Sequence, residues 1–164
     1  MTGLKRYLTE FILKFIPETR CFRLKRALYR FVGIKIGKNV RMCSSARFMG
    51  AGRIEIGCNT WVGHQVLIIS SSYIRIGSDV DIAPNVYIGT GSHSIDPTGK
   101  RVAGIGYNKD IIIGDGSWLG VNACILPGVS VGQKCIIAAG AVVINDTESL
   151  SVYGGVPAKK IRSL

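Results

Sequence analysis

The chain has 164 residues, 47% of them apolar, which is enough for one domain with a continuous core. No apolar run is long enough to span a bilayer, and Lys14 interrupts the stretch that a secretory signal would need. Five cysteines without paired spacing argue against a disulfide framework and favour a reduced, cytoplasmic protein.

The positive charge is concentrated at the N-terminus. Residues 1–47 contain twelve Lys or Arg and two acids, which gives +10 of the total +11, whereas residues 48–164 contain nine and eight. Apolar residues in the first 33 positions follow helical spacing in two stretches separated by Pro17. We therefore predict two short basic amphipathic helices, with the stripes Leu4, Leu8, Phe11, Phe15 and Leu24, Leu28, Phe31.

This segment, residues 1–33, has three possible roles. It could cover the open end of the repeat body with its apolar face, because the ends of solenoids need covering. It could also contact an anionic membrane surface, to which each Lys or Arg contributes about 1 kcal/mol. Nucleic-acid binding is the least favoured, because no nucleic-acid motif accompanies the charge.

The strongest feature is a six-residue repeat between Ile36 and Glu148. Fifteen units each begin with a large apolar residue, and the fifth position of each unit is small or β-branched, which predicts that both positions point inward. A glycine often follows the leading residue, and we expect it to serve turns that need positive φ. The units begin at Ile36, Met42, Phe48, Ile56, Val62, Ile68, Ile76, Ile82, Ile88, Ile113, Leu119, Ile125, Val131, Ile137 and Val143.

Three such units form one triangular coil of about eighteen residues, so the repeat predicts a prism of about five coils with short parallel strands on three faces. The fold class is therefore all-β, a parallel β-helix over residues 34–148 after the short helical segment. A tail, residues 149–164, follows it.

One insertion, residues 94–112, interrupts the repeat, and an insertion of this length in a regular scaffold is usually functional. His93 precedes it, at the sixth position of its unit, which we expect to be an outward-facing corner of the prism. His64, the other histidine, is expected on a face as a surface or intersubunit residue. Two histidines cannot supply the three ligands of a zinc site such as that of a carbonic anhydrase, and we expect no metal.

The repeat, together with the string Thr90-Gly91-Ser92-His93 and the nearby Asp96, resembles the hexapeptide-repeat acyltransferases, most closely the sugar and polysaccharide O-acetyltransferases. The resemblance implies a left-handed β-helix and a catalytic role for His93 as general base. An imidazole suits this role because it titrates near neutral pH and can take the proton of a sugar hydroxyl. Its second nitrogen needs an acceptor, for which Asp96 and a loop carbonyl are the candidates.

The segment from Ile113 to Arg162 resembles the acetyl-CoA half of the same family, notably in Gly155-Val156-Pro157-Ala158-Lys159-Lys160-Ile161-Arg162. The resemblance implies acetyl-CoA as the donor, bound between the prisms of a homotrimer. It places Val121, Ala139, Ile144 and Asn145 along the pantetheine arm, and Lys159 and Arg162 at the CoA phosphates, where cations have the expected chemistry. Val121 stands where galactoside-type enzymes carry a serine.

The same resemblance places acceptor contacts at Ser71 and Asn85, and Ser71 replaces an acidic residue of the galactoside enzymes. We therefore expect an acceptor in a capsule, exopolysaccharide or O-antigen unit carried on a membrane lipid, and an enzyme peripheral to the inner face of the membrane. Two alternatives remain: an amino-sugar N-acetyltransferase and a non-catalytic β-helical binding or scaffold protein.

Overall fold

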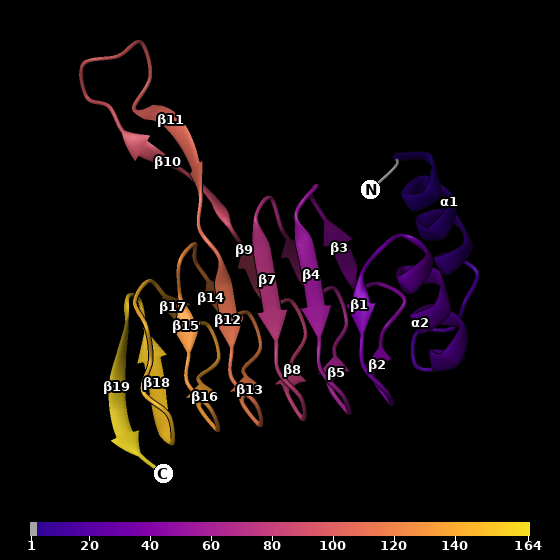
Figure 1. The fold of residues 1–164 in the computed structure, drawn as a ribbon. Coiled ribbons are helices and arrows are strands. Elements are labelled where there is room, and N and C mark those ends of the chain that lie inside the picture. The colour runs from indigo at the N-terminus through magenta and orange to yellow at the C-terminus, as the bar shows by residue number, and fades with distance from the viewer. Residues whose placement is uncertain (1–2) are drawn as a thin grey trace.

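The computed structural model describes residues 3–164. Two helices, α1 (Gly3–Leu13) and α2 (Phe22–Phe31), precede a parallel β-helix, and a hairpin projects from its side (Figure 1). No helix among these residues is long and apolar enough to cross a membrane.

Three parallel sheets form the faces of the prism, and the chain visits them in a fixed order. The first face contains β1 (Lys35–Ile36), β4 (Arg53–Ile56), β7 (Tyr73–Ile76), β12 (Ile111–Ile113) and β15 (Ser130–Val131). The second contains β2 (Arg41–Met42), β5 (Trp61–Val62), β8 (Asp81–Ile82), β13 (Trp118–Leu119), β16 (Ile136–Ile137), β18 (Ser151–Gly155) and β19 (Ala158–Ser163). The third contains β3 (Arg47–Met49), β6 (Leu67–Ile69), β9 (Tyr87–Gly89), β14 (Cys124–Ile125) and β17 (Val142–Val143).

The inward positions of the repeat form one continuous core, as the sequence predicts. The fifteen leading residues are all buried, and so are most fifth positions, such as Val40, Val80 and Ala141. Ser92 is the clearest exception, because it lies in the projecting hairpin. Five coils are complete, and a partial sixth follows, in which Thr147 bridges to Val131 and β18 pairs with β16.

The glycines that follow the leading residues have a different role from the one we expected. Positive φ occurs instead at the fourth position of several units, at Asn39, Asn59 and Asp79. The glycines permit close stacking of coils: a Cβ added to Gly37 would lie 2.6 Å from the backbone nitrogen of Cys58. The need for glycine is therefore steric rather than conformational.

The two helices cover the N-terminal end of the prism, but not with the apolar stripes that the sequence suggested. The buried positions are Thr9 and Leu13 of α1 and Lys25 and Tyr29 of α2, and Leu28 packs partly buried against the core, whereas Leu4, Leu8, Phe11, Phe15, Leu24 and Phe31 are exposed. The prediction of two helices is correct, but of the two predicted apolar stripes only Leu28 packs against the core. The buried face is set by hydrogen bonds to the first coil.

These hydrogen bonds replace those of a missing coil. Within the prism, the carbonyls of Ile56, Thr60 and Val62 accept N–H groups from the preceding coil. The equivalent carbonyls of the first coil have no preceding coil, and side chains of the helices donate to them instead. The donors are Arg30 to Ile36 at 2.6 Å, Arg26 to Val40 at 2.8 Å, Lys25 to Met42 at 3.1 Å, Tyr29 to Ala46 at 2.8 Å, and Arg6 to Phe48.

Candidate active site

The insertion folds as an antiparallel hairpin of β10 (Gly91–Ile95) and β11 (Ala103–Asn108). It leaves the third face after β9 and returns to the first face at β12, and it projects well away from the prism (Figure 1). The hairpin begins before the predicted insertion, and Ile111 and Ile112 already belong to β12. His93 is therefore not on a corner of the prism; it lies within β10 and pairs with Gly106.

The imidazole of His93 is oriented by the opposite strand. Its Nδ1 lies 2.9 Å from the carbonyl oxygen of Gly104. Because a carbonyl can only accept, neutral His93 carries its proton on Nδ1 in this arrangement, which leaves the lone pair of Nε2 available. Of the two candidates for this orienting role, the structure brings the loop carbonyl to His93.

Asp96 has other hydrogen-bond partners in the turn at the tip of the hairpin. Its Oδ1 accepts from the hydroxyl of Thr98 at 2.9 Å and from the N–H groups of Thr98 and Gly99 at 3.0 and 2.9 Å. The Thr98 hydroxyl and these N–H groups lower the pKa of Asp96 below its ordinary value. The carboxylate thus organises the turn that precedes Lys100 and Arg101.

An open hollow of about 480 Å³ lies beside His93. The described residues that line this hollow all belong to the hairpin and its tip. They are His93, Asp96, Gly99, Lys100, Arg101, Ala103, Gly104, Ile105 and Gly106. Ile95, Val102 and Ile105 are highly exposed on the same hairpin. One chain therefore provides an imidazole and two cations on an arm that the prism of the same chain does not enclose.

Ser71 lies at the root of this arm, whereas Asn85 does not. The N–H of Ser71 donates to the hydroxyl of Thr90 at 2.8 Å, and Thr90 directly precedes β10. Asn85 lies in the turn between β8 and β9, has φ of 61°, and donates its N–H to the carbonyl of His64. Its conformation matches that of Gln65 and Asn122, at the equivalent turns of neighbouring coils, so Asn85 also has a structural role.

The residues predicted to contact CoA fall on two separate corners of the prism. Val121 and Ala139 follow β13 and β16, on the corner between the second and third faces, and the N–H of Gly140 donates to the carbonyl of Val121. Ile144 and Asn145 follow β17, on the corner between the third and first faces, from which the hairpin also leaves. The third face separates the two pairs within one chain.

Lys159 and Arg162 lie on β19, which extends the second face through β18. Both side chains are exposed, whereas the neighbouring Lys160 forms an ion pair with Glu148 at 2.6 Å. Lys159 lies opposite Gly154 in the β18–β19 pair, so its side chain leaves the sheet on the same side as a Cβ on Gly154 would. Such a Cβ would lie 3.2 Å from the side chain of Ala138, the residue before Ala139. The two cations are thus on the same side of the molecule as Ala139.

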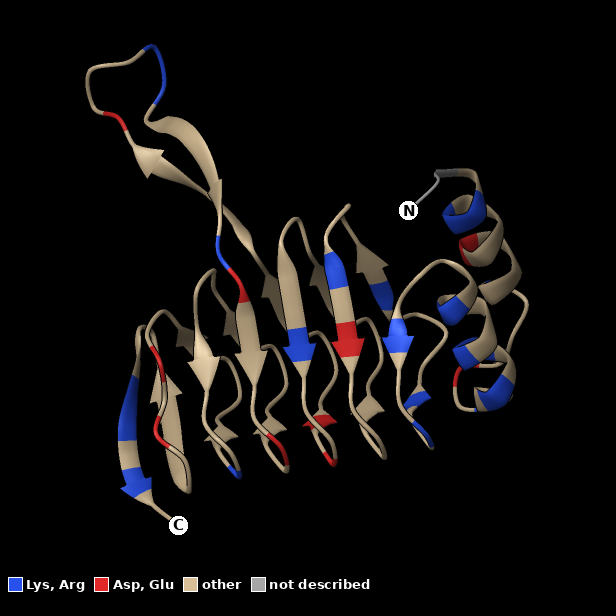
Figure 2. Ribbon diagram, viewed as in Figure 1, with Lys and Arg blue, Asp and Glu red and all other residues tan. Residues whose placement is uncertain are grey.

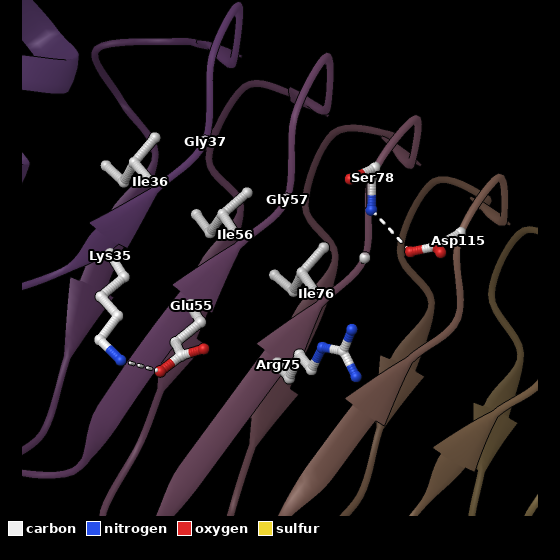
Figure 3. Close-up of a pocket in the computed structure, with 11 residues that line it drawn as sticks. Lys35, Ile36, Gly37, Glu55, Ile56, Gly57, Arg75, Ile76, Ser78 and Asp115 are labelled. Carbon is white, nitrogen blue, oxygen red and sulfur yellow. Dashed lines mark hydrogen bonds and ion pairs between the residues drawn. The ribbon is translucent and has the colours of Figure 1, made fainter.

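A second hollow, of about 350 Å³, lies where the first face turns toward the second (Figure 3). Lys35 pairs with Glu55 at 2.7 Å, and Asp115 accepts the backbone N–H of Ser78 at 2.8 Å, so three of its four charged groups are engaged within the hollow. Among residues 3–164, no histidine and no residue predicted to bind substrate or cofactor lines it. Its hydrogen bonds join successive coils, which indicates a structural role.

His64 lies at the junction between the helical cap and the prism. Its Nδ1 is 3.4 Å from a carboxylate oxygen of Glu18, which also accepts from the N–H and hydroxyl of Ser45. The thiol of Cys43 completes a group of three potential ligand atoms within 4.8 Å of one another. The buried ammonium of Lys25 lies beside this group and donates to the carbonyls of Pro17, Glu18 and Met42. The group fastens the cap to the first two coils.

A loop carbonyl was one of the two candidates for orienting His93, but the sequence did not identify Gly104 as its residue. The division of the residues predicted to contact CoA between two corners was not foreseen. A backbone carbonyl is present at every residue, so the sequence does not show which one accepts the hydrogen bond from His93. The pairing of His93 with Gly106 depends on the register of the hairpin. The capping arginines and lysine were visible as charge, but their targets are backbone groups.

Comparison with known proteins places the chain in a family. Residues 110–144 match the family of the hexapeptide repeat of succinyl-transferase. Over 140 residues the chain is 30% identical to a galactoside O-acetyltransferase of Escherichia coli, an alignment covering 85% of this chain and 68% of the relative. It is also 30% identical over 141 residues to WcaF of Escherichia coli, named for acetyl transfer in colanic acid biosynthesis, covering 86% and 75%.

A Saccharomyces cerevisiae protein named as an acetyltransferase is 41% identical over 111 residues, which are 68% of this chain and 56% of that protein. The chain thus spans little more than half the length of this relative.

Solved structures share the fold. A hexapeptide-repeat acetyltransferase from Vibrio cholerae superposes with a TM-score of 0.68 at 27% identity, covering 98% of this chain and 91% of the other. A galactoside acetyltransferase in complex with coenzyme A superposes with a TM-score of 0.65 at 24% identity, covering 99% and 83%. The parallel prism is the left-handed β-helix of these proteins, and the chain belongs to the hexapeptide-repeat acetyltransferase family.

Proposed function

We propose that this chain transfers an acetyl group from acetyl-CoA to a hydroxyl of a sugar in a cell-surface polysaccharide unit, with His93 as general base. The observation that carries the proposal is the hydrogen bond from His93 Nδ1 to the carbonyl of Gly104, which leaves Nε2 able to accept a proton. The family and the coenzyme A held by the related galactoside acetyltransferase support the donor.

The reaction follows from this tautomer. Nε2 takes the proton of the acceptor hydroxyl as its oxygen attacks the thioester carbonyl carbon, and the carbon–sulfur bond then breaks. The imidazolium returns the proton to the departing CoA sulfur. No cysteine lies in the hairpin, so direct transfer within a ternary complex is favoured over an acyl-enzyme on a thiol. Val121 has no hydroxyl, so we assign stabilisation of the oxyanion to backbone N–H groups at its corner.

A sugar attached to a lipid carrier is the acceptor that we favour. Ser71 stands in place of an acidic side chain, so this position at the root of the hairpin offers a hydroxyl to the acceptor rather than a carboxylate. The hollow beside His93 contains Lys100 and Arg101, which suit an acceptor with phosphate or carboxylate groups. The similarity to WcaF, named for colanic acid biosynthesis, supports a polysaccharide acceptor.

The active unit in this proposal is a cyclic trimer. His93 stands on an arm that the prism of its own chain does not enclose, and the third face separates the two pairs of cofactor residues. A neighbouring prism would bring the corner of Val121 and Ala139 against the corner from which the hairpin leaves. A rotation that closes after three subunits then creates three equivalent sites.

The His93 proposal is tested by His93→Ala, with His64→Ala as the matched control because His64 is the other histidine of the chain. We expect turnover with acetyl-CoA and a sugar acceptor to fall at least about a hundredfold in His93→Ala, with the affinity for CoA retained. Near-normal turnover in His93→Ala would remove His93 from the mechanism. The two alternatives are tested separately. Mass spectrometry of the product distinguishes an O-acetyl from an N-acetyl group. If the protein does not bind CoA, the alternative of a non-catalytic scaffold is favoured.

The shared site is tested by mixing two inactive variants, His93→Ala and Lys159→Glu. If His93 comes from one chain and Lys159 from the next, mixed trimers contain some sites with both native residues, and part of the activity returns. If both residues come from the same chain, the mixture stays inactive. Light scattering on the native protein reports the number of subunits, and an active monomer would contradict the trimer.

A further inference from the structure

One face of α1 is apolar and exposed, although the helix is fixed to the prism by its other face. Thr9 and Leu13 are buried, and Arg6 donates to the carbonyl of Phe48. The opposite face exposes six large apolar side chains, with exposed fractions from 42% to 75%. At about 100° per residue the five within α1 lie on one arc of the helix, and Phe15 follows in the turn after Leu13. They are Leu4, Tyr7, Leu8, Phe11, Ile12 and Phe15, and we call this set the α1 apolar face.

Two exposed lysines lie next to this face: Lys5 within α1, and Lys14 directly after the helix ends at Leu13. The ammonium of Lys5 also lies 4.8 Å from the ring centroid of Phe31, whose exposed ring extends the apolar surface onto α2. The rings of Phe11 and Phe15 contact each other edge to face, with centroids 5.3 Å apart. The surface is thus a continuous aromatic and aliphatic strip between cations.

Both acids of the first 47 residues are engaged elsewhere. Glu10 pairs with Arg6 at 3.2 Å, and Glu18 contacts Ser45 and His64. Figure 2 shows Lys and Arg gathered on the two helices, in contrast to the mixed charges of the prism. Arg6, Lys25, Arg26 and Arg30 serve the carbonyl edge of the first coil, whereas Lys5, Lys14, Arg20 and Arg23 are not needed for capping.

We propose that the α1 apolar face docks on an anionic membrane surface, with the helix lying in the plane of the interface. An exposed apolar arc with aromatic side chains and lysines at its borders is the pattern of an interfacial helix. The apolar groups enter the acyl boundary, and the lysine stems extend to lipid phosphates. A second copy of the same face is disfavoured as the occupant, because it would bring together two N-terminal segments that each carry +10 of the net charge.

The test is sedimentation of the full chain with vesicles of phosphatidylcholine, with and without phosphatidylglycerol. We expect binding only to vesicles with phosphatidylglycerol, and release as salt is raised, because the charge attraction is screened. Lys5→Glu with Lys14→Glu should weaken binding at least about tenfold. The matched control, Lys38→Glu with Lys134→Glu, makes the same charge change on exposed lysines of the prism and should bind almost as the native protein does.

A second variant separates lipid from protein contacts. Phe11→Ser with Phe15→Ser removes apolar surface that is already exposed, so the fold should be retained, and vesicle binding should be lost. The proposal is overturned if the native chain ignores phosphatidylglycerol, or if the prism control weakens binding as much as the α1 variant does. It is also overturned if light scattering shows that the Phe variant dissociates an oligomer, because the face then belongs to a subunit interface.

Discussion

The ammonium nitrogen of Lys25 lies 3.1 Å from the carbonyl oxygen of Met42, a position that an N–H of a preceding coil would occupy in the middle of the prism. Lys25 has no solvent-exposed surface, and it also donates to Pro17 and Glu18. A positive side chain in the core is stable here because three carbonyls surround it.

Lys25→Met should therefore destabilise the protein strongly, although it replaces a buried charge with an apolar group of similar length. Three carbonyls lose their donor, and we expect a loss of about 2–4 kcal/mol in the free energy of unfolding. Urea unfolding measures it. Lys35→Met, at an exposed ion pair with Glu55, is the control and should cost less than about 1 kcal/mol. Equal losses in the two variants would contradict the capping role.

Acid should loosen the junction between cap and prism. Burial opposes ionisation of Glu18, but the N–H and hydroxyl of Ser45, with His64 and Lys25, outweigh it and lower the pKa of Glu18 below its ordinary 4.5. Because the pKa of Glu18 is lower in the folded protein than in the unfolded chain, its carboxylate contributes stability above pH 4.5. That contribution is lost as the pH falls through the pKa of the folded state.

The thermal midpoint, followed from about pH 7 to pH 3.5, should therefore fall less steeply in Glu18→Gln than in the native protein. Glu148→Gln, which removes a carboxylate at the opposite end of the prism, should keep the native slope. If the thermal midpoint of Glu18→Gln falls with pH as steeply as that of the native protein, another group governs the loss of stability in acid.

Asp96→Asn should leave the chemistry nearly unchanged, because Asp96 holds the hairpin tip rather than the imidazole. The amide oxygen of Asn can still accept from Thr98 and Gly99. We expect turnover to fall less than about tenfold, with the pH dependence of kcat/KM preserved. If the fall of kcat/KM on the acidic side moves to a different pH in Asp96→Asn, then Asp96 acts on His93 and is its partner.

Gly114→Ala should test the close stacking of coils. The added Cβ would lie 2.6 Å from the backbone nitrogen of Gln133, and neither coil can move away without breaking the ladder. We expect a loss of about 1–3 kcal/mol or more, measured by urea unfolding. Gly106→Ala is the matched control, because its nearest neighbour is the His93 ring at 3.6 Å. Tolerance of Gly114→Ala would show that the coils can separate locally.

The prism could be predicted from sequence because its rule is local: each leading residue, such as Ile76 or Leu119, points inward at a fixed interval. The hairpin could be predicted only as an insertion. The contact between His93 and Gly104 depends on strand register, which the composition of residues 91–108 does not determine. The helices were correctly located, but the sequence did not identify Lys25 as a buried residue, because a charge pattern gives no sign of backbone acceptors.

The donors on the carbonyl edge also limit what can attach to the end of the prism. A row of unpaired carbonyls accepts strands from other chains, and repeated end-to-end addition would produce a fibre. Arg26, Arg30 and Tyr29 occupy those acceptors, so the first coil offers no template for another strand. At the other end, β19 turns back antiparallel on β18 and interrupts the parallel stacking. Strand addition is therefore blocked at the N-terminal end of the prism, and at the C-terminal end it is blocked on the second face.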